Sequence, residues 1–315
     1  MFRWIAAGCT GATLLIMIYR KLFTHTAKCL STRTLAGKVV IVTGANTGIG
    51  KTTSQELAER HAKVIMACRD ISKGQSALKD IRKNTKNGIL VVKQLDLQSQ
   101  ASVRQFCSQI LEEESRLDVL INNAGVMGHP FTLTEDGMEI HMAVNHFSNF
   151  LLTNLLLDLL KKSAPSRIVF VSSSLHKRGT VDFSMFDKKQ KHPYSNSKLA
   201  NIYFARALSR NLDGTGVRVH TLHPGMVNTE LSRHSLSRFM RVLLSPLAWF
   251  LLQSSREGCQ TVVYCAVSEE LDHVTGRYYG KCKEEPWTEI AKENSMCKKL
   301  WEVSERLTGI ANNVS

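Results

Sequence analysis

A tyrosine and a lysine stand four positions apart in the run Tyr194-Ser195-Asn196-Ser197-Lys198, where helical spacing begins. Residues four apart share one face of a helix, so the phenol and the ammonium would be neighbours. An unperturbed tyrosine has a pKa of about 10, too high for ready proton exchange at neutral pH, and a nearby cation lowers that pKa. The pattern therefore indicates acid–base chemistry. A buried tyrosine beside a surface lysine is the alternative for these five residues alone.

Three consecutive serines, Ser172, Ser173 and Ser174, end a run of β-branched and aromatic residues that begins at Arg167. In open α/β sheets, ligands bind in the crevice outside the carboxyl ends of the strands. We therefore expect a serine hydroxyl to face a ligand here. The run itself leaves open which of the three serines it is.

Residues 43–50 read TGANTGIG and join an expected strand to an expected helix. Glycines permit a tight turn and a close backbone approach to phosphate, and a helix N-terminus offers free N–H groups. An ordinary strand-to-helix connection is one alternative. A P-loop is another, with Ala45 in its first position and Lys51 and Thr52 as phosphate and magnesium ligands. It lacks the first glycine and explains nothing further along the chain.

Arg69 and Asp70 follow the second expected strand. At this place in dinucleotide folds a carboxylate binds the ribose 2′-hydroxyl of NAD, whereas an arginine accommodates the 2′-phosphate of NADP. A guanidinium can grip phosphate with two hydrogen bonds. Arg69 favours NADP(H), and Asp70 is a weaker indication of NAD. A solvated surface charge is the alternative for Arg69.

Short aliphatic runs alternate with stretches of helical spacing from Gly37 onward. The expected strands are residues 38–43, 63–68, 89–95, 118–122, 167–172 and 217–222. The expected helices include residues 52–61, 101–114 and 196–211. Continuous apolar strands alternating with helices predict an α/β fold with a single, doubly wound parallel sheet of the Rossmann type and helices on both faces. We find no repeat and no obvious linker.

The chain resembles the short-chain dehydrogenase/reductase family in four motifs that follow one another in the family's order. They are the glycine turn, NNAG at residues 122–125, YSNSK at residues 194–198 and HPGMVNT at residues 223–229. The resemblance covers residues 35–310. Within the family the chain is most similar to membrane-anchored, NADP-preferring retinol dehydrogenases of the microsomal branch. The similarity to these retinol dehydrogenases lies in five short runs: ANTGIGK at residues 45–51, ACRD at 67–70, SKLAN at 197–201, LW at 300–301 and LTGI at 307–310. The stretch between Ser173 and Tyr194 looks shorter than in those relatives.

The resemblance implies hydride transfer between a nicotinamide and an alcohol or carbonyl carbon. It makes Tyr194 the general acid and base, and Lys198 the residue that lowers the tyrosine pKa and binds the nicotinamide ribose. Ser173 would hold the substrate oxygen, and Asn145 would complete a water relay. No metal is required, and the histidines lack metal-ligand spacing.

The resemblance also implies the residues that bind NADP(H). Asp96 and Leu97 would lie against the adenine, and Thr229 would meet the nicotinamide carboxamide. The full set is Gly44, Asn46, Thr47, Gly48, Ile49, Gly50, Arg69, Asp96, Leu97, Asn123, Ala124, Gly125, Tyr194, Lys198, Pro224, Gly225 and Thr229.

Residues 4–19 are apolar or small throughout, slightly short of the roughly 17–25 residues that span a bilayer comfortably. We expect residues 1–34 to form a membrane-anchor helix and a juxtamembrane segment, ahead of a catalytic domain at residues 35–315. A cleaved signal peptide and a mitochondrial presequence are the alternatives. Basic residues after the apolar run favour a cytosolic catalytic domain. The microsomal relatives imply the endoplasmic reticulum, with a mitochondrial membrane as the alternative.

Residues 231–253 mix arginines with many large apolar side chains, and we expect a substrate loop near residues 230–255. It would lie against the membrane and admit a hydrophobic substrate. A buried helix pair is the alternative. Retinol and retinal are the first expectation, and a steroid or lipid aldehyde is the second.

The chain has 315 residues, 43% hydrophobic and 22% charged, which excludes wholesale disorder. Its formal charge of +14 favours anionic partners. A nucleic-acid-binding protein would show a basic face with interspersed aromatics. The basic residues here are dispersed, so we expect no nucleic-acid partner. The eight cysteines lack paired spacing, which favours a reducing compartment. A catalytically silent, cofactor-binding membrane scaffold and a homodimer stay open.

Overall fold

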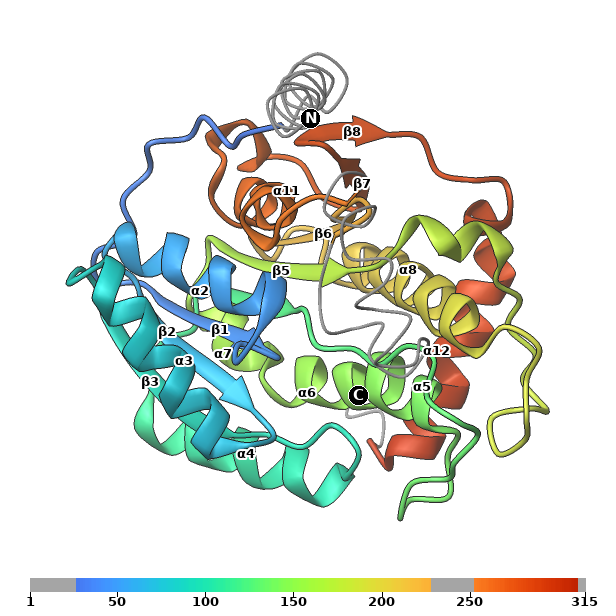
Figure 1. Ribbon diagram of the computed structural model, residues 1–315. Helices are drawn as coiled ribbons and strands as arrows, with labels where there is room; N and C mark the ends of the chain where they lie inside the picture. Colours follow the sequence, from blue (N-terminus) through green and yellow to red (C-terminus); the bar gives the residue numbers. More distant parts are fainter. Residues whose placement is uncertain (1–26, 228–251, 311–315) are drawn as a thin grey trace, which may run out of the picture.

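The computed structural model describes residues 27–227 and 252–310. Most of the expected anchor, most of the expected substrate loop, and Thr229 lie outside these residues. Eight strands form one sheet in the order β3-β2-β1-β4-β5-β6-β7-β8 (Figure 1). The strands are β1 (Val39–Thr43), β2 (Lys63–Cys68), β3 (Ile89–Gln94), β4 (Val119–Asn122), β5 (Ser166–Val171), β6 (Val217–His223), β7 (Arg277–Gly280) and β8 (Lys283–Glu285).

Strands β1 to β7 are all parallel, which confirms the predicted Rossmann-type α/β sheet. The last pair differs, because β8 runs antiparallel to β7. Only Lys281 and Cys282 join these two strands, and both have positive φ angles, of 51° and 56°. A two-residue turn of this kind forms a hairpin and forces the antiparallel direction.

Helices cover both faces of the sheet, which is why most residues of β1, β2, β4, β5 and β6 are buried. One face packs against α2 (Gly48–Glu59), α3 (Ile71–Asn84) and α11 (Ser255–Val267). The other packs against α4 (Gln100–Glu113), α6 (Ser148–Leu155), α7 (Leu157–Lys162) and α8 (Pro193–Asn211). Helix α12 (Asn294–Thr308) lies outside α8, and its Trp301 packs against Phe150 and Phe204.

The polypeptide between β4 and α6 winds first as α5 (Ile140–Met142) and then as the π-helix η1 (Ala143–Phe147). The Glu139 carboxylate caps this segment by accepting the backbone N–H groups of His141 and Met142. Three short 3₁₀ turns complete the described chain: η2 (Ser174–Arg178), η4 (Glu269–Leu271) and η5 (Ile290–Lys292).

The strand order reverses between β1 and β4, so their following loops leave toward opposite sides. In doubly wound sheets a crevice forms at the carboxyl ends of the strands at this point. The glycine turn, NNAG and the three serines, to which the sequence analysis assigned ligand binding, lie at the ends of β1, β4 and β5.

The end of the expected juxtamembrane segment is tied to the rest of the fold by Arg33. Arg33 contacts both carboxylate oxygens of Asp272, at 2.8 and 2.5 Å, and the largely buried Arg167 reaches Asp272 at 2.6 Å. These contacts, that of Arg33 first, lower the pKa of Asp272 to about 2. Within residues 27–227 and 252–310, no helix is both long and apolar enough to span a bilayer.

Candidate active site

A cavity of about 300 Å³ lies at the carboxyl ends of the central strands. Most of the residues predicted to bind the cofactor line it; Gly225 does not, and Thr229 is outside the described chain. Further lining residues stand outside the predicted cofactor-binding set, although the sequence analysis had considered Asp70 and Ser172. These are Thr43, Ala67, Asp70, Lys73, Leu95, Gln98, Val126, Met127, Val144, Val171 and Ser172.

The glycine turn is packed against the end of β4. The Thr43 hydroxyl accepts the backbone N–H groups of Asn123 and Ala124, at 3.0 and 2.9 Å, and the Asn123 amide donates to the Thr43 carbonyl at 2.8 Å. A Cβ at Gly50 would overlap both the Gly44 carbonyl and the Asn123 amide, so this position needs glycine. Thr47 is the N-cap residue of α2, and its side chain makes no cap hydrogen bond, which leaves backbone N–H groups for an anionic ligand.

The P-loop alternative is wrong for this turn. Lys51 does not line the cavity, and its Nζ pairs with Asp80 of α3 at 2.9 Å. The Thr52 hydroxyl donates to backbone carbonyls, including that of Ser255 at 3.0 Å. Neither side chain is available for the role that a P-loop would give it.

Two cations stand at the cavity edge after β2. Arg69 and Lys73 both line the cavity and are both exposed. Asp70 accepts the backbone N–H of Lys73 at 3.0 Å and so caps α3. Its carboxylate therefore has a local structural role, and the cationic pair gives this end of the cavity its positive charge. Lys73, in the first turn of α3 and four residues after Arg69, was not predicted.

Helix α8 begins at Pro193, earlier than predicted, which places Tyr194 in its first turn and Lys198 one turn later. The Lys198 Nζ lies 5.7 Å from the centre of the Tyr194 ring and donates to the Val171 carbonyl at 2.8 Å. Burial lowers the pKa of Lys198 to about 8. It raises the pKa of Tyr194 to about 12, with Ser173 acting in the opposite direction. The predicted lowering of the tyrosine pKa is not seen, because desolvation outweighs the neighbouring groups.

The three serines are distinguished by their surroundings. Ser172 is buried, and its hydroxyl donates to the Lys198 carbonyl at 2.8 Å. Ser173 is half-buried beside Tyr194, and its hydroxyl accepts the Leu175 N–H at 3.2 Å. Ser174 is exposed. Ser173 is therefore the serine that the fold brings to the tyrosine, although it does not line the cavity.

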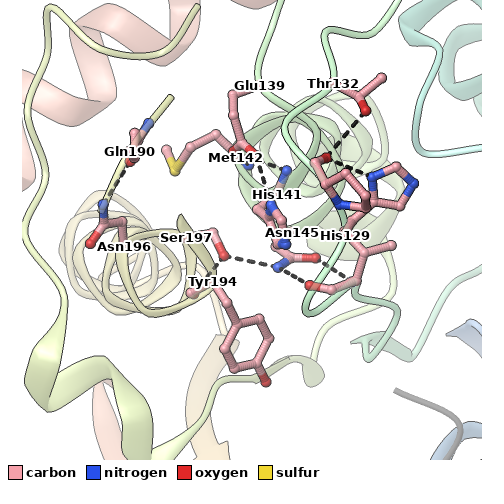
Figure 2. Close-up of polar contacts among 12 residues, drawn as sticks. His129, Thr132, Glu139, His141, Met142, Asn145, Gln190, Tyr194, Asn196 and Ser197 are labelled. Carbon is pink, nitrogen blue, oxygen red and sulfur yellow. Dashed lines mark hydrogen bonds and ion pairs between the residues drawn. The ribbon is translucent and has the colours of Figure 1, made fainter. Parts of the chain in front are cut away.

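Asn145 lies in the π-helix, fully buried, and connects three parts of the site (Figure 2). Its amide oxygen accepts the Val126 N–H at 2.8 Å. Its Nδ2 donates to the Val126 carbonyl at 3.1 Å and to the Ser197 hydroxyl at 2.8 Å. Ser197 in turn donates to the Tyr194 carbonyl at 2.8 Å. Asn145 thus fixes the loop after β4 against the first turn of α8.

Metal ligation was not predicted from the sequence. In the part of the chain that the structure describes, no three His, Cys, Asp or Glu side chains are grouped so as to hold a metal ion. The cysteines in this part, Cys29, Cys68, Cys107, Cys259, Cys265, Cys282 and Cys297, are free thiols.

Comparison with known proteins places the chain in a family. The sequence model of the short chain dehydrogenase family matches residues 38–238. The chain is 48% identical to retinol dehydrogenase 14 of Mus musculus over 289 residues, covering 87% of this chain and 86% of the relative. It is 47% identical to retinol dehydrogenase 13 of Homo sapiens over 290 residues, covering 90% and 88%.

Solved structures share the fold of this chain. A crystal structure of an uncharacterized protein from Mycobacterium Paratuberculosis superposes with a TM-score of 0.71 at 33% identity, over 90% of this chain and 97% of the other. The Pseudomonas aeruginosa RhlG/NADP active-site complex superposes with a TM-score of 0.62 at 25% identity, over 78% and 94%. Since the sequence match spans most of the chain and the fold agrees, the chain belongs to the short-chain dehydrogenase/reductase family.

Proposed function

We propose that this chain is an NADP(H)-dependent oxidoreductase that interconverts a hydrophobic alcohol and its carbonyl, with retinol and retinal as the first substrate pair. The observation that carries the proposal is the convergence of Tyr194, Lys198 and Ser173 beside a cavity whose far end is cationic. Relatives named retinol dehydrogenases, at 46–48% identity, support the substrate class.

The residues around the cavity fit a nicotinamide dinucleotide phosphate. The uncapped start of α2 would hold the pyrophosphate, and the glycines let the backbone approach it closely. Arg69 and Lys73 would hold the 2′-phosphate, because two cations suit a phosphate better than a ribose hydroxyl. When bound, the nicotinamide supplies or accepts the hydride. The NADP complex of RhlG is consistent with this choice over NAD.

The proton transfer that accompanies hydride transfer would be carried out by residues of the protein. Tyr194 would donate its phenolic proton to the carbonyl oxygen during reduction and accept it from the hydroxyl during oxidation. Lys198, buried and held by the Val171 carbonyl, would place a positive charge beside the phenol as it ionises. Ser173 would donate a hydrogen bond to the substrate oxygen while negative charge develops there. Asn145 would keep α8 in register with the loop after β4.

We further propose that residues 1–34 anchor the enzyme to the endoplasmic reticulum membrane, with the catalytic domain in the cytosol, and that residues near 230–255 admit the substrate. The argument is the apolar run at residues 4–19 with its flanking basic residues. Cell fractionation with protease protection tests it: deletion of residues 1–26 should release the protein from membranes. Retention of the truncated protein on membranes would contradict it.

The decisive experiment on function is NADPH consumption by the detergent-solubilised full chain. The panel is retinal, a steroid ketone and a medium-chain aldehyde. Turnover of retinal above the other two supports the proposal. Turnover of the steroid or the aldehyde alone would show that the substrate is not a retinoid, but it would still support the proposed oxidoreductase chemistry. Binding of NADPH without oxidation of any compound would instead indicate a silent scaffold.

A further inference from the structure

His223, the last residue of β6, makes two hydrogen bonds in opposite directions. Its Nε2 lies 3.0 Å from Oε1 of Glu285 on β8, and its Nδ1 lies 3.2 Å from the backbone N of Gly225. Between His223 and Gly225 is Pro224, which lines the cavity. The imidazole therefore connects the edge of the sheet to the turn that bounds the proposed cofactor site.

These partners determine which ring nitrogen carries the proton. A backbone N–H can only donate, so Nδ1 of His223 must accept from Gly225. In the neutral ring the proton then lies on Nε2, where it is donated to the Glu285 carboxylate. A ring protonated on both nitrogens could not accept from Gly225. Glu285 thus favours the one tautomer that holds the turn.

The sheet edge leaves space for this pair. Gly280 on β7 is the register partner of His223. A Cβ at Gly280 would overlap both Nε2 of His223 and Oε1 of Glu285. The Tyr278 ring lies 5.7 Å from the imidazole, and the His223 side chain is only 14% exposed. The ring is therefore confined to one orientation from both sides.

Within the residues that the structure describes, the turn beyond His223 is held at both of its ends. Gly225 has a φ of 85° and lies close to the Gln253 side chain. The backbone of Gln253 donates to the Met226 carbonyl at 2.8 Å. These contacts hold the far end of the turn, whereas the bond from Gly225 to His223 holds the end next to Pro224.

From this geometry we infer that His223 and Glu285 are positioning residues for the cofactor: they fix the Pro224–Gly225 turn against the cavity and so strengthen dinucleotide binding. The inference rests on the proposed function. Neither side chain is required to touch a reacting atom, so the effect falls on cofactor affinity and not on the rate of the chemical step.

The test is the Kd of NADPH for the detergent-solubilised full chain, read from tryptophan fluorescence, with kcat measured in parallel. His223→Leu should raise the Kd about fivefold, the factor expected for one lost hydrogen bond of ordinary strength. His223→Asn keeps an acceptor at the Nδ1 position and should recover most of the affinity. Both variants should retain kcat at saturating NADPH.

Glu285→Leu should raise the Kd in the same direction by a smaller factor, because Nδ1 remains but the ring is no longer held. Glu284→Leu is the matched control on the same strand, because Glu284 pairs with the exposed Arg277 and not with His223. The Kd of NADPH for this variant should equal that of the wild type. A wild-type Kd in both His223→Leu and Glu285→Leu would overturn the inference and leave the proposed function standing. A wild-type chain that binds neither NADPH nor NADH would overturn both.

Discussion

The Lys198 ammonium and the Val171 carbonyl are joined by a 2.8 Å hydrogen bond inside the protein, where only 3% of the lysine is exposed. Within the described ranges no carboxylate pairs with this lysine. A buried ammonium held by one neutral acceptor costs stability. Such a cost is expected where a charge is kept for function.

Replacing Lys198 with methionine should therefore stabilise the fold while ending turnover. The shift of the lysine pKa from 10.5 to about 8 corresponds to a cost on the order of 3 kcal/mol. Loss of the bond to Val171 offsets about 1 kcal/mol of the gain. Urea unfolding at pH 7 should thus show the Lys198→Met variant about 2 kcal/mol more stable than the wild type.

The lowered pKa of Lys198 also makes the stability difference between Lys198→Met and the wild type depend on pH. Between pH 8 and pH 10.5 the unfolded wild-type chain keeps the Lys198 proton that the folded chain has lost, so wild-type stability rises across this window. The advantage of Lys198→Met should shrink accordingly. An advantage that stays constant from pH 7 to pH 10 would contradict the buried charge as its origin.

Tyr194→Phe should reduce turnover below detection while changing the Kd of NADPH by less than about twofold. The substitution removes the phenolic proton but leaves the ring that packs beside Lys198. Single-turnover reduction of retinal and fluorescence titration with NADPH measure the two quantities. Tyr264→Phe, whose hydroxyl contacts Glu270 at the surface, is the control. Substantial turnover by Tyr194→Phe would remove Tyr194 as the acid.

Arg69→Ala should narrow the preference for NADPH over NADH at least tenfold, and Lys73→Ala should narrow it in the same direction. Each loses a charged contact to the 2′-phosphate, and NADH has no such group. The ratio of the two Kd values measures the effect. Lys79 lies on α3, as Lys73 does, but does not line the cavity. Lys79→Ala removes one positive charge and should leave the ratio of the two Kd values unchanged. An unaltered ratio in Arg69→Ala would show that another residue contacts the phosphate.

Much of the fold could be predicted because its signals are local. The six expected strands all form, since their apolar runs are long enough for strands buried on both faces. Strands β7 and β8 were missed: they are four and three residues long, and β8 reads KEE, without an apolar pattern. Their pairing depends on the turn at Lys281 and Cys282.

The site was less predictable where it depends on contacts distant in sequence. The π-helix that contains Asn145 was not predicted, because π-helices are rare and occur mostly as short bulges within α-helices. Asp70, a weak indication of NAD from the sequence, also caps α3 by accepting the backbone N–H of Lys73, and the sequence analysis did not predict this cap. The pairing of His223 with Glu285, 62 residues apart, has no local signal in either segment.

The three serines show the same limit, and they give the last prediction. Ser172→Ala loses a buried hydrogen bond to the Lys198 carbonyl, and Ser173→Ala loses the bond from the Leu175 N–H that caps η2. Each variant should lose about 1 kcal/mol of stability, so unfolding experiments do not separate them. Turnover does. Ser173→Ala should lower kcat about 100-fold, because a donor to the developing negative charge is gone. Ser172→Ala should keep kcat within about threefold. If the losses in kcat were reversed between the two variants, Ser172 would be the serine that holds the substrate oxygen.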